Sequence, residues 1–289
     1  MAAPDPPACV SVVIPAFNEE QAIATQIRDL TKVLDASGWT YELLVVDDGS
    51  TDRTASRAEA CAARVLRLAR NGGYGAALKA GISATRYEWV LITDADGTYP
   101  AGSVLDLLRA AEGADMVVGS RTGATRHIPV VRRPAKWLVR LYASLLVWRH
   151  IPDLNSGMRL IRRSALNAFW DLLPAGFSFT TTITLASLAT GRRVSYVTIE
   201  YLARVGQSKI RASDFFRIFS LITRVMFRFF PRRVLALWVS LLWLAGAFLL
   251  WPLGRGRAAV ASGLLCGIAV WLAGFRLDRT ARLERARQP

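Results

Sequence analysis

The sequence predicts an α/β protein with a mostly parallel, Rossmann-type sheet, followed by interfacial helices and a C-terminal transmembrane hairpin of two helices. Three observations predict this architecture. Short apolar runs alternate with helical patterns early in the chain, basic and aromatic residues interleave in two later segments, and two long uncharged runs come last. With 289 residues, a formal net charge of +15 and 52% hydrophobic residues, the chain is too apolar for a disordered polycation.

Apolar runs rich in β-branched residues predict five strands, at 10–15, 41–46, 65–68, 89–93 and 116–119. Helical patterns lie between them, from about Glu19, from about Asp52, over 74–85 and after Pro100. Continuous short apolar runs separated by helices are typical of parallel strands that are covered on both faces. Ligands of such sheets bind at the carboxyl ends of the strands.

Carboxylates gather where two of the predicted strands end. Asp47 and Asp48 follow the strand at 41–46, and a Gly turn with Ser50 and Asp52 comes next. Two like charges at one strand end repel each other unless a donor-rich ligand or a cation lies beside them. Ser50 and Asp52 have two open interpretations, as part of this site or only as caps of the following helix.

A second acidic pair, Asp94 and Asp96, follows the strand at 89–93. In an extended segment residues i and i+2 point to the same side, so both carboxylates face a common space. Oxygen ligands without His or Cys suit Mg²⁺ or Mn²⁺, and such an ion often takes diphosphate oxygens as well. The sequence therefore predicts a cation site at this strand end.

Three glycines open the helix at 74–85 and partly match a dinucleotide-binding fingerprint. Leu78 occupies the position of the third fingerprint glycine, and the segment follows the third strand, whereas the fingerprint normally follows the first. We therefore interpret Gly72, Gly73 and Gly75 as a close-packed turn near a nucleotide.

Residues 121–164 contain ten Lys or Arg and one acidic residue, Asp153, among Trp and Leu side chains. On a helix from about Pro134 this pattern suits the headgroup layer of a membrane. An ordinary solvated face with a core stripe is the alternative interpretation.

A second amphipathic helix is predicted at 214–230, where Arg217, Arg224 and Arg228 share one face and Phe residues fill the rest. A net charge of +15 would also suit nucleic acid, but the arginines concentrate beside apolar segments. The sequence therefore predicts a membrane partner and no nucleic acid.

The runs at 234–253 and 258–275 contain no charged side chain, and a short Gly/Arg turn separates them. At about 1.5 Å per residue these 20 and 18 residues span roughly 30 and 27 Å, close to the hydrocarbon thickness of a bilayer. Arginines flank both ends of the predicted hairpin, so the positive-inside rule places the preceding domain and both termini in the cytoplasm. The first nine residues lack the basic start and apolar run of a signal peptide. We therefore expect a cell-membrane protein with two spans.

The segments at 11–20 (SVVIPAFNEE), 46–52 (VDDGSTD) and 94–96 (DAD), with the glycine turn, together resemble family-two glycosyltransferases of the GT-A fold. With the segment at 153–159 (DLNSGMR) and the hairpin, the chain is similar to polyprenyl-phosphate glycosyltransferases related to dolichyl-phosphate mannosyltransferase. The resemblance runs over about 10–275. It divides the chain into a cytoplasmic GT-A domain, a juxtamembrane amphipathic helix, the hairpin and a basic cytoplasmic tail, at 1–211, 212–233, 234–276 and 277–289.

The resemblance implies a donor site for a nucleotide sugar, formed by Pro15, Phe17, Glu19, Val46, Asp48, Asp94, Ala95 and Asp96. It also implies that Asp94 and Asp96 hold Mg²⁺ or Mn²⁺ on the donor diphosphate. Thr98 is a further metal-ligand candidate, and it stands where relatives often carry a Gln that assists the metal. Residues 201–209 (YLARVGQSK) resemble a phosphate-binding Arg-Gly-Ser-Lys loop that is shortened by one residue.

The implied reaction moves one hexose from a donor of the UDP-glucose or GDP-mannose type to a polyprenyl phosphate. A lipid monophosphate has a second pKa near 6, so at neutral pH it can attack the anomeric carbon without a general base. We expect inversion, with the phosphate held by Arg121, Arg133, Arg204 and Lys209. Asp153 has two open interpretations, as part of the acceptor site or as a structural partner of a nearby Arg.

Two other functions remain as alternatives. A processive polysaccharide synthase would also join such a domain to membrane helices, but the chain lacks a Gln-x-x-Arg-Trp motif. A non-catalytic, membrane-tethered sugar-nucleotide-binding protein would bind the donor without turnover.

Overall fold

The computed structural model describes residues 9–121, 133–203, 213–249, 268–269 and 272–273. Its centre is a seven-stranded sheet in the order β3-β2-β1-β4-β6-β5-β7. The strands are β1 Cys9–Ala16, β2 Thr40–Asp47, β3 Arg64–Arg67, β4 Trp89–Ile92, β5 Met116–Ser120, β6 Arg159–Arg162 and β7 Val194–Thr198. Strand β6 runs antiparallel to both of its neighbours, and the other pairs are parallel. The mostly parallel α/β sheet is therefore confirmed.

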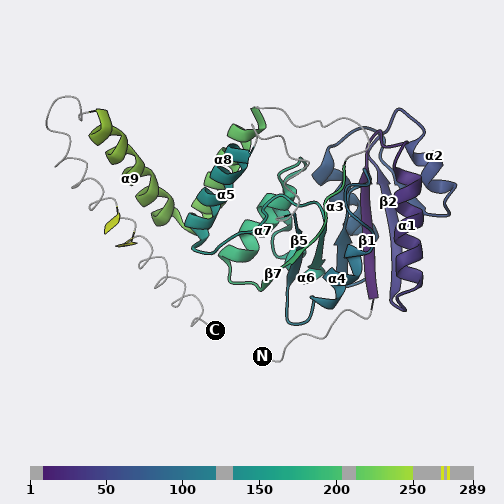
Figure 1. Cartoon of the computed structure of the whole chain (residues 1–289). Coiled ribbons are helices and arrows are strands. Elements are labelled where there is room, and N and C mark those ends of the chain that lie inside the picture. The colour runs from purple at the N-terminus through teal and green to yellow at the C-terminus, as the bar shows by residue number, and fades with distance from the viewer. Residues whose placement is uncertain (1–8, 122–132, 204–212, 250–267, 270–271, 274–289) are drawn as a thin grey trace.

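Helices cover both faces of the sheet (Figure 1). One face packs against helices that include α1 and α4, and the other packs against α3, α6 and α7. Their bounds are α1 Ile23–Asp35, α2 Thr54–Glu59, α3 Tyr74–Ala84, α4 Ser103–Arg109, α6 Arg163–Asn167 and α7 Phe179–Ala189, with a 3₁₀ turn at Trp170–Leu172. Every residue of α7 is buried, because one side of this helix meets the sheet and another side meets the next group of helices.

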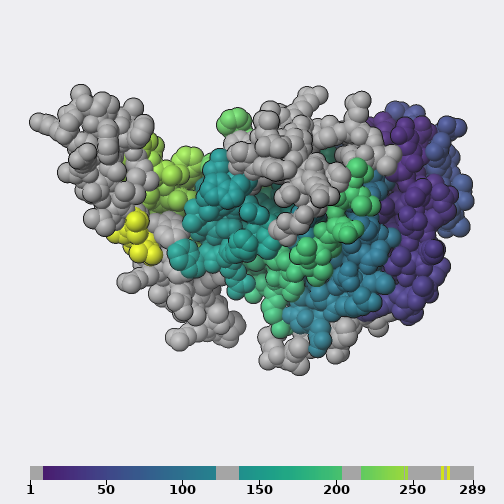
Figure 2. Space-filling view, in the orientation of Figure 1, coloured from purple at the N-terminus to yellow at the C-terminus, as the bar shows by residue number. Residues whose placement is uncertain are grey.

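That group contains α5 Arg133–Val147, α8 Ser213–Phe229 and the start of α9 Pro231–Leu249. The Tyr142 ring of α5 stacks on Phe219 of α8, with centroids 4.2 Å apart, and its hydroxyl hydrogen-bonds with Thr223 Oγ1 at 2.8 Å. Helices α5 and α8 lie side by side, and α9 leads away from the sheet (Figure 1). In the space-filling view the teal side chains around α5 lie between the sheet and the light green side chains of α9 (Figure 2).

Helix α8 coincides with the predicted amphipathic helix to within one residue at each end, and α9 begins three residues before the predicted hairpin. Within the described ranges, no helix combines the length and the apolar character needed to cross a membrane. Most of the second predicted span and the whole tail at 277–289 lie outside the described residues.

Candidate active site

The loops that follow β1 and β2 are joined by hydrogen bonds. The Asn18 amide donates to Ser50 Oγ at 3.0 Å, and the Asn18 side-chain oxygen accepts from the Thr51 amide at 2.9 Å. Asn18 has a φ of +53°, a left-handed conformation that Asn tolerates better than most residues. The Glu19 amide donates to Thr54 Oγ1 at 2.9 Å. The predicted donor-site residues of these two loops therefore belong to one continuous surface at the strand ends.

Backbone amides surround the first acidic pair. Asp48 accepts the amides of Gly72 and Gly73, at 2.8 and 2.9 Å, and Asp47 accepts the Ser50 amide at 3.2 Å. These donors offset the repulsion between the two carboxylates without a cation. Asp48 thereby holds the glycine turn beside the end of β2, where Gly73 has a φ of +95°.

Asp52 binds backbone amides at the start of α2 and in the loop after β1. Its carboxylate accepts the Thr54 amide at 2.9 Å and the Glu20 amide at 3.2 Å. Burial alone would raise the pKa of Asp52, but these hydrogen bonds outweigh it and lower the pKa. This geometry supports the structural interpretation of Asp52.

Asp94 and Asp96 follow β4, and each carboxylate is oriented by a neighbouring hydroxyl. Tyr74 donates its hydroxyl to Asp94 Oδ1 at 3.0 Å, and Thr98 donates its hydroxyl to Asp96 Oδ1 at 2.6 Å. The Thr98 amide reaches the same Asp96 oxygen at 3.1 Å. Burial raises the pKa of Tyr74 well above its usual value, so this tyrosine stays neutral and remains a donor.

The glycine turn that carries Tyr74 is closed from outside by the segment before α7. The Ala76 amide donates to the Ala175 carbonyl at 2.8 Å, and a Cβ on Gly75 would meet the Pro174 carbonyl oxygen at 2.1 Å. The exposed Phe177 ring stacks on Tyr74, with centroids 5.6 Å apart. Glycine is required at position 75 because the two backbones approach so closely.

Gly157 contacts the other side of Asp94. A Cβ on Gly157 would lie 2.3 Å from Asp94 Oδ2, and the Gly157 amide donates to the Tyr99 hydroxyl at 2.7 Å. Burial also raises the pKa of Tyr99, which therefore stays neutral. Asp94 is thus enclosed between the start of α3 and the loop that precedes β6.

The same loop carries Asp153, which forms a bidentate ion pair with Arg121 at the end of β5. Arg121 Nε lies 2.7 Å from Asp153 Oδ2, and Nη2 lies 2.9 Å from Oδ1. The Arg121 guanidinium also lies over the Tyr201 ring, 5.3 Å from its centroid. Burial would raise the pKa of Asp153, but the Arg121 charge and its hydrogen bonds outweigh burial and lower it.

Comparison with known proteins shows the family of the chain. A family model described as glycosyl transferase family 2 matches residues 11–170, which is more than half of the chain. The chain belongs to this family. The match includes both acidic pairs, the glycine turn and the Arg121–Asp153 pair.

Relatives of this glycosyltransferase include a dolichyl-phosphate hexose transferase of Haloferax volcanii, 33% identical over 205 residues, which cover 70% of this chain and 86% of the relative. An undecaprenyl-phosphate mannosyltransferase of Micrococcus luteus is 29% identical over 215 residues, which cover 70% of this chain and 87% of the relative. Among solved structures, glucosyl-3-phosphoglycerate synthase from Mycobacterium tuberculosis with Mn²⁺, UDP-glucose and phosphoglyceric acid is 25% identical. Its TM-score is 0.59, with 75% of this chain and 79% of that chain covered.

The predicted donor-site residues of this glycosyltransferase fall into two groups. Pro15 and Val46 are neighbours in the β1–β2 register, but the side chains of Val46 and Ala95 are buried in the core. Asp48, Asp94 and Asp96 lie at strand ends, and Phe17 and Glu19 lie in the loop after β1. Asp94, Phe17 and Glu19 are partly exposed, whereas Asp48 and Asp96 are buried like Val46 and Ala95, so the partly exposed residues are better placed to meet a ligand.

The predicted phosphate-binding residues are described only in part. Arg121 is held by Asp153, and Arg133 is the first residue of α5. Arg204 and Lys209 lie outside the described residues. No group of three or more His, Cys, Asp or Glu that could hold a metal occurs in the described part of the chain.

Sequence reasoning did not single out Tyr74, Tyr99, Gly157 or Arg159. Arg159 Nε donates to the Ser156 carbonyl at 2.8 Å, and the residue is fully buried at the start of β6. A charged residue inside the apolar run from Met158 to Ile161 was the available signal for this buried group.

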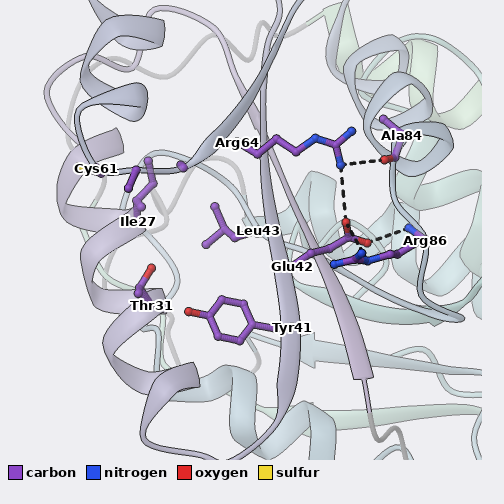
Figure 3. A pocket seen from close by; sticks show the side chains of 11 residues that line it. Ile27, Thr31, Tyr41, Glu42, Leu43, Cys61, Arg64, Ala84 and Arg86 are labelled. Atoms are coloured by element: carbon purple, nitrogen blue, oxygen red, sulfur yellow. Dashed lines mark hydrogen bonds and ion pairs between the residues drawn. The ribbon is translucent and has the colours of Figure 1, made fainter.

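A pocket of about 570 Å³ lies elsewhere, near the first residues of β2 and β3 (Figure 3). Its lining includes Tyr41, Glu42, Cys61, Arg64 and Arg86, and the Glu42 carboxylate lies 3.7 and 3.9 Å from the two arginines. None of the predicted site residues lines this pocket, which lies near the first residues of β2 and β3 and not at their carboxyl ends.

Proposed function

We propose that this glycosyltransferase moves one hexose from a nucleotide sugar to a polyprenyl phosphate, with inversion at the anomeric carbon. The proposal rests on the match to two lipid-phosphate sugar transferases, over 86% and 87% of their lengths. The donor is of the UDP-glucose or GDP-mannose type, and the product is a polyprenyl-phosphate sugar.

On the donor side, Asp94 and Asp96 are suited to a divalent cation. Both are carboxylates at one strand end, and hard oxygen ligands suit Mg²⁺ and Mn²⁺. Such ions are commonly held by one or two carboxylates together with substrate phosphates. A bound ion would offset the charge that develops on the departing nucleoside diphosphate. Thr98 orients Asp96 through its hydroxyl, and the proposal keeps it as a candidate ligand.

On the acceptor side, the nucleophile is a phosphate oxygen that is already ionised at neutral pH. The protein therefore needs to hold and orient this phosphate, and it needs no general base. Arg121, Arg133, Arg204 and Lys209 are proposed for this role, since guanidinium groups match phosphate oxygens. The Arg121–Asp153 pair supports a structural role for Asp153, which fixes the orientation of the guanidinium.

The proposal places the reaction at the cytoplasmic face of the cell membrane. Large apolar side chains of α5, of α8 and of the residue that follows α5 are exposed, namely Trp137, Leu138, Leu141, Trp148, Phe216 and Phe227. Exposed arginines of α8 accompany them, at positions 217, 224 and 228. Such mixed surfaces suit the headgroup layer, where a polyprenyl phosphate presents its charged end. The uncharged runs at 234–253 and 258–275 are proposed as two spans, with both termini cytoplasmic.

The test combines a donor screen with analysis of the product. The purified full chain, in detergent with Mn²⁺ and a polyprenyl phosphate, is given a panel of radiolabelled nucleotide sugars. Chromatography of a lipid carrying a single sugar, β-linked from an α-linked donor, is the expected result. Long polymer would support the polysaccharide synthase instead, and donor binding without product would support the non-catalytic alternative.

A further inference from the structure

Arg159 is a fully buried arginine whose hydrogen bonds all go to neutral acceptors. Its Nε donates to the Ser156 carbonyl at 2.8 Å, and Nη2 donates to the Leu154 carbonyl at 3.2 Å. Its Nη1 donates to the Thr180 carbonyl at 3.0 Å and to Thr184 Oγ1 at 2.7 Å. In the described part of the chain no carboxylate forms an ion pair with it.

Such a group is expensive to bury. A charged side chain loses its hydration inside a protein, and burial accordingly lowers the pKa of Arg159. A leucine or methionine would fill the same space without that cost. The guanidinium therefore serves a purpose that an apolar side chain cannot serve, and its contacts indicate which one. Its planar fork links the loop at 154–156 to the first turns of α7.

The linked loop contacts both sides of the candidate site. At one end Asp153 holds the Arg121 guanidinium, on the proposed acceptor side. At the other end Gly157 packs against the Asp94 carboxylate, on the proposed donor side. Only the Leu154–Ser156 segment separates the two contacts, and that is the segment whose carbonyls Arg159 binds.

We propose that Arg159 is a positioning residue that fixes the 153–157 loop and thereby sets the distance between Asp94 and Arg121. The inference rests on the proposed function and deepens it, because the sugar and the phosphate must meet in line between these two groups. Reacting atoms have to approach within roughly 3 to 3.5 Å, and a misplacement of about 1 Å can cost a hundredfold in rate. A loop anchored at its middle by a rigid fork meets that requirement.

Arg163, just after β6, provides a matched control. It is also an arginine that binds backbone carbonyls, with Nη1 2.8 Å from the Ile82 carbonyl and Nε 3.0 Å from the Tyr87 carbonyl. These acceptors belong to the end of α3 and the loop before β4, at the opposite end of β6 from Arg159. An Arg→Lys change at either position keeps a long basic side chain and removes the planar fork.

The experiment compares Arg159→Lys with Arg163→Lys in the full chain. We expect kcat for lipid glycosylation to fall roughly tenfold to a hundredfold in Arg159→Lys and to stay within about twofold in Arg163→Lys. Hydrogen exchange of the substrate-free chain is the second measurement. Amides at 153–158 should lose protection in Arg159→Lys alone. Equal kcat values for the two variants, or unchanged protection of this loop, would overturn the proposal.

Two further comparisons distinguish a displaced loop from general destabilisation or misfolding of the variant. In an Asp153→Asn background the effect of Arg159→Lys should shrink, because both changes act through one loop, whereas general destabilisation would simply add. If Arg159→Lys does not fold, Thr184→Val removes one of the acceptors of Arg159 and should cause a smaller fall in kcat together with a smaller loss of protection at the same amides, 153–158. A wild-type chain that makes no lipid-linked sugar would refute the proposed function, while the exchange data would still decide the role of Arg159.

Discussion

Gly157 illustrates how closely the chain packs around Asp94. Replacement by Ala would place a Cβ 2.3 Å from Asp94 Oδ2, so the carboxylate or the loop has to move. We expect Gly157→Ala to lower the rate of transfer at least tenfold while the chain stays folded. Gly102→Ala is the control, because a Cβ there meets nothing within 4 Å and the backbone is already helical. Initial rates and thermal unfolding of both variants check this, and equal rates would contradict it.

Asp96 is predicted to hold the donor metal. Asp96→Asn keeps the size of the side chain and removes its charge, so transition-state stabilisation should fall by several kcal/mol. Transfer is measured at saturating Mn²⁺, beside Asp106→Asn, which removes an exposed carboxylate from a surface ion pair. Activity of Asp96→Asn within a few-fold of wild type would exclude the metal role.

The Arg121–Asp153 pair makes a prediction about pH. Asp153 has a lowered pKa, so its pairing stabilises the fold above the unfolded value of about 3.9. That contribution is lost as pH falls through the lower folded pKa. Asp153→Asn should therefore destabilise the chain at pH 7, by roughly 1 to 3 kcal/mol for a partly buried pair that loses one partner.

The difference in unfolding free energy between wild type and Asp153→Asn should become smaller below about pH 4, as the wild-type carboxyl becomes protonated. Thermal unfolding of the full chain in detergent, at a series of pH values, measures this difference. A difference in unfolding free energy that becomes larger in acid would show that folding raises the pKa of Asp153, and it would contradict the prediction.

At the scale of elements, α8 combines exposed arginines with exposed phenylalanines, and we expect it to lie against anionic lipid. Reversing Arg217, Arg224 and Arg228 to Glu should raise the apparent KM for polyprenyl phosphate in vesicles that contain anionic lipid. The control reverses Arg53, Arg67 and Arg109, which are exposed on the sheet domain, and it changes the net charge equally. An equal effect of the two triple variants would refute a specific role of α8.

The first five strands could be predicted because each is a short apolar run, and their ends identified the acidic pairs. The part of the fold between residues 158 and 200 gave no comparable pattern. Strand β6 (RLIR) has the same pattern as β3 (RVLR), but it lies beyond the alternation of strands and helices that identified β3, and β7 (VSYVT) is short and partly polar. Helix α7 (FTTTITLASLA) is buried all round, so it lacks the polar face that marks a helix. Tyr99, Gly157 and Arg159 depend on contacts between distant segments, which no local pattern reveals.

At the scale of the whole molecule, the described helices divide the surface into two environments. The sheet domain carries exposed ion pairs such as Arg67 with Glu59, which suits contact with water. Helix α9 instead exposes Leu235, Trp238, Leu242 and Trp243. A large exposed apolar surface is costly in water and is usually covered by lipid or protein. This division agrees with the proposed attachment of the catalytic domain to a membrane.

The position of β6 also has a consequence for how the chain is made. Strands β1 to β4 lie within residues 9–92 and pair with one another, so they can assemble early in synthesis. Strand β5 is made next, yet its two sheet neighbours, β6 and β7, are both later in sequence. Until residues 159–162 leave the ribosome, the edge of β4 therefore has no partner and offers open backbone groups to other nascent chains. The insertion of β6 closes this edge and brings Gly157 against Asp94 in one event, so a single step removes an open strand edge and completes the packing around one carboxylate of the candidate site.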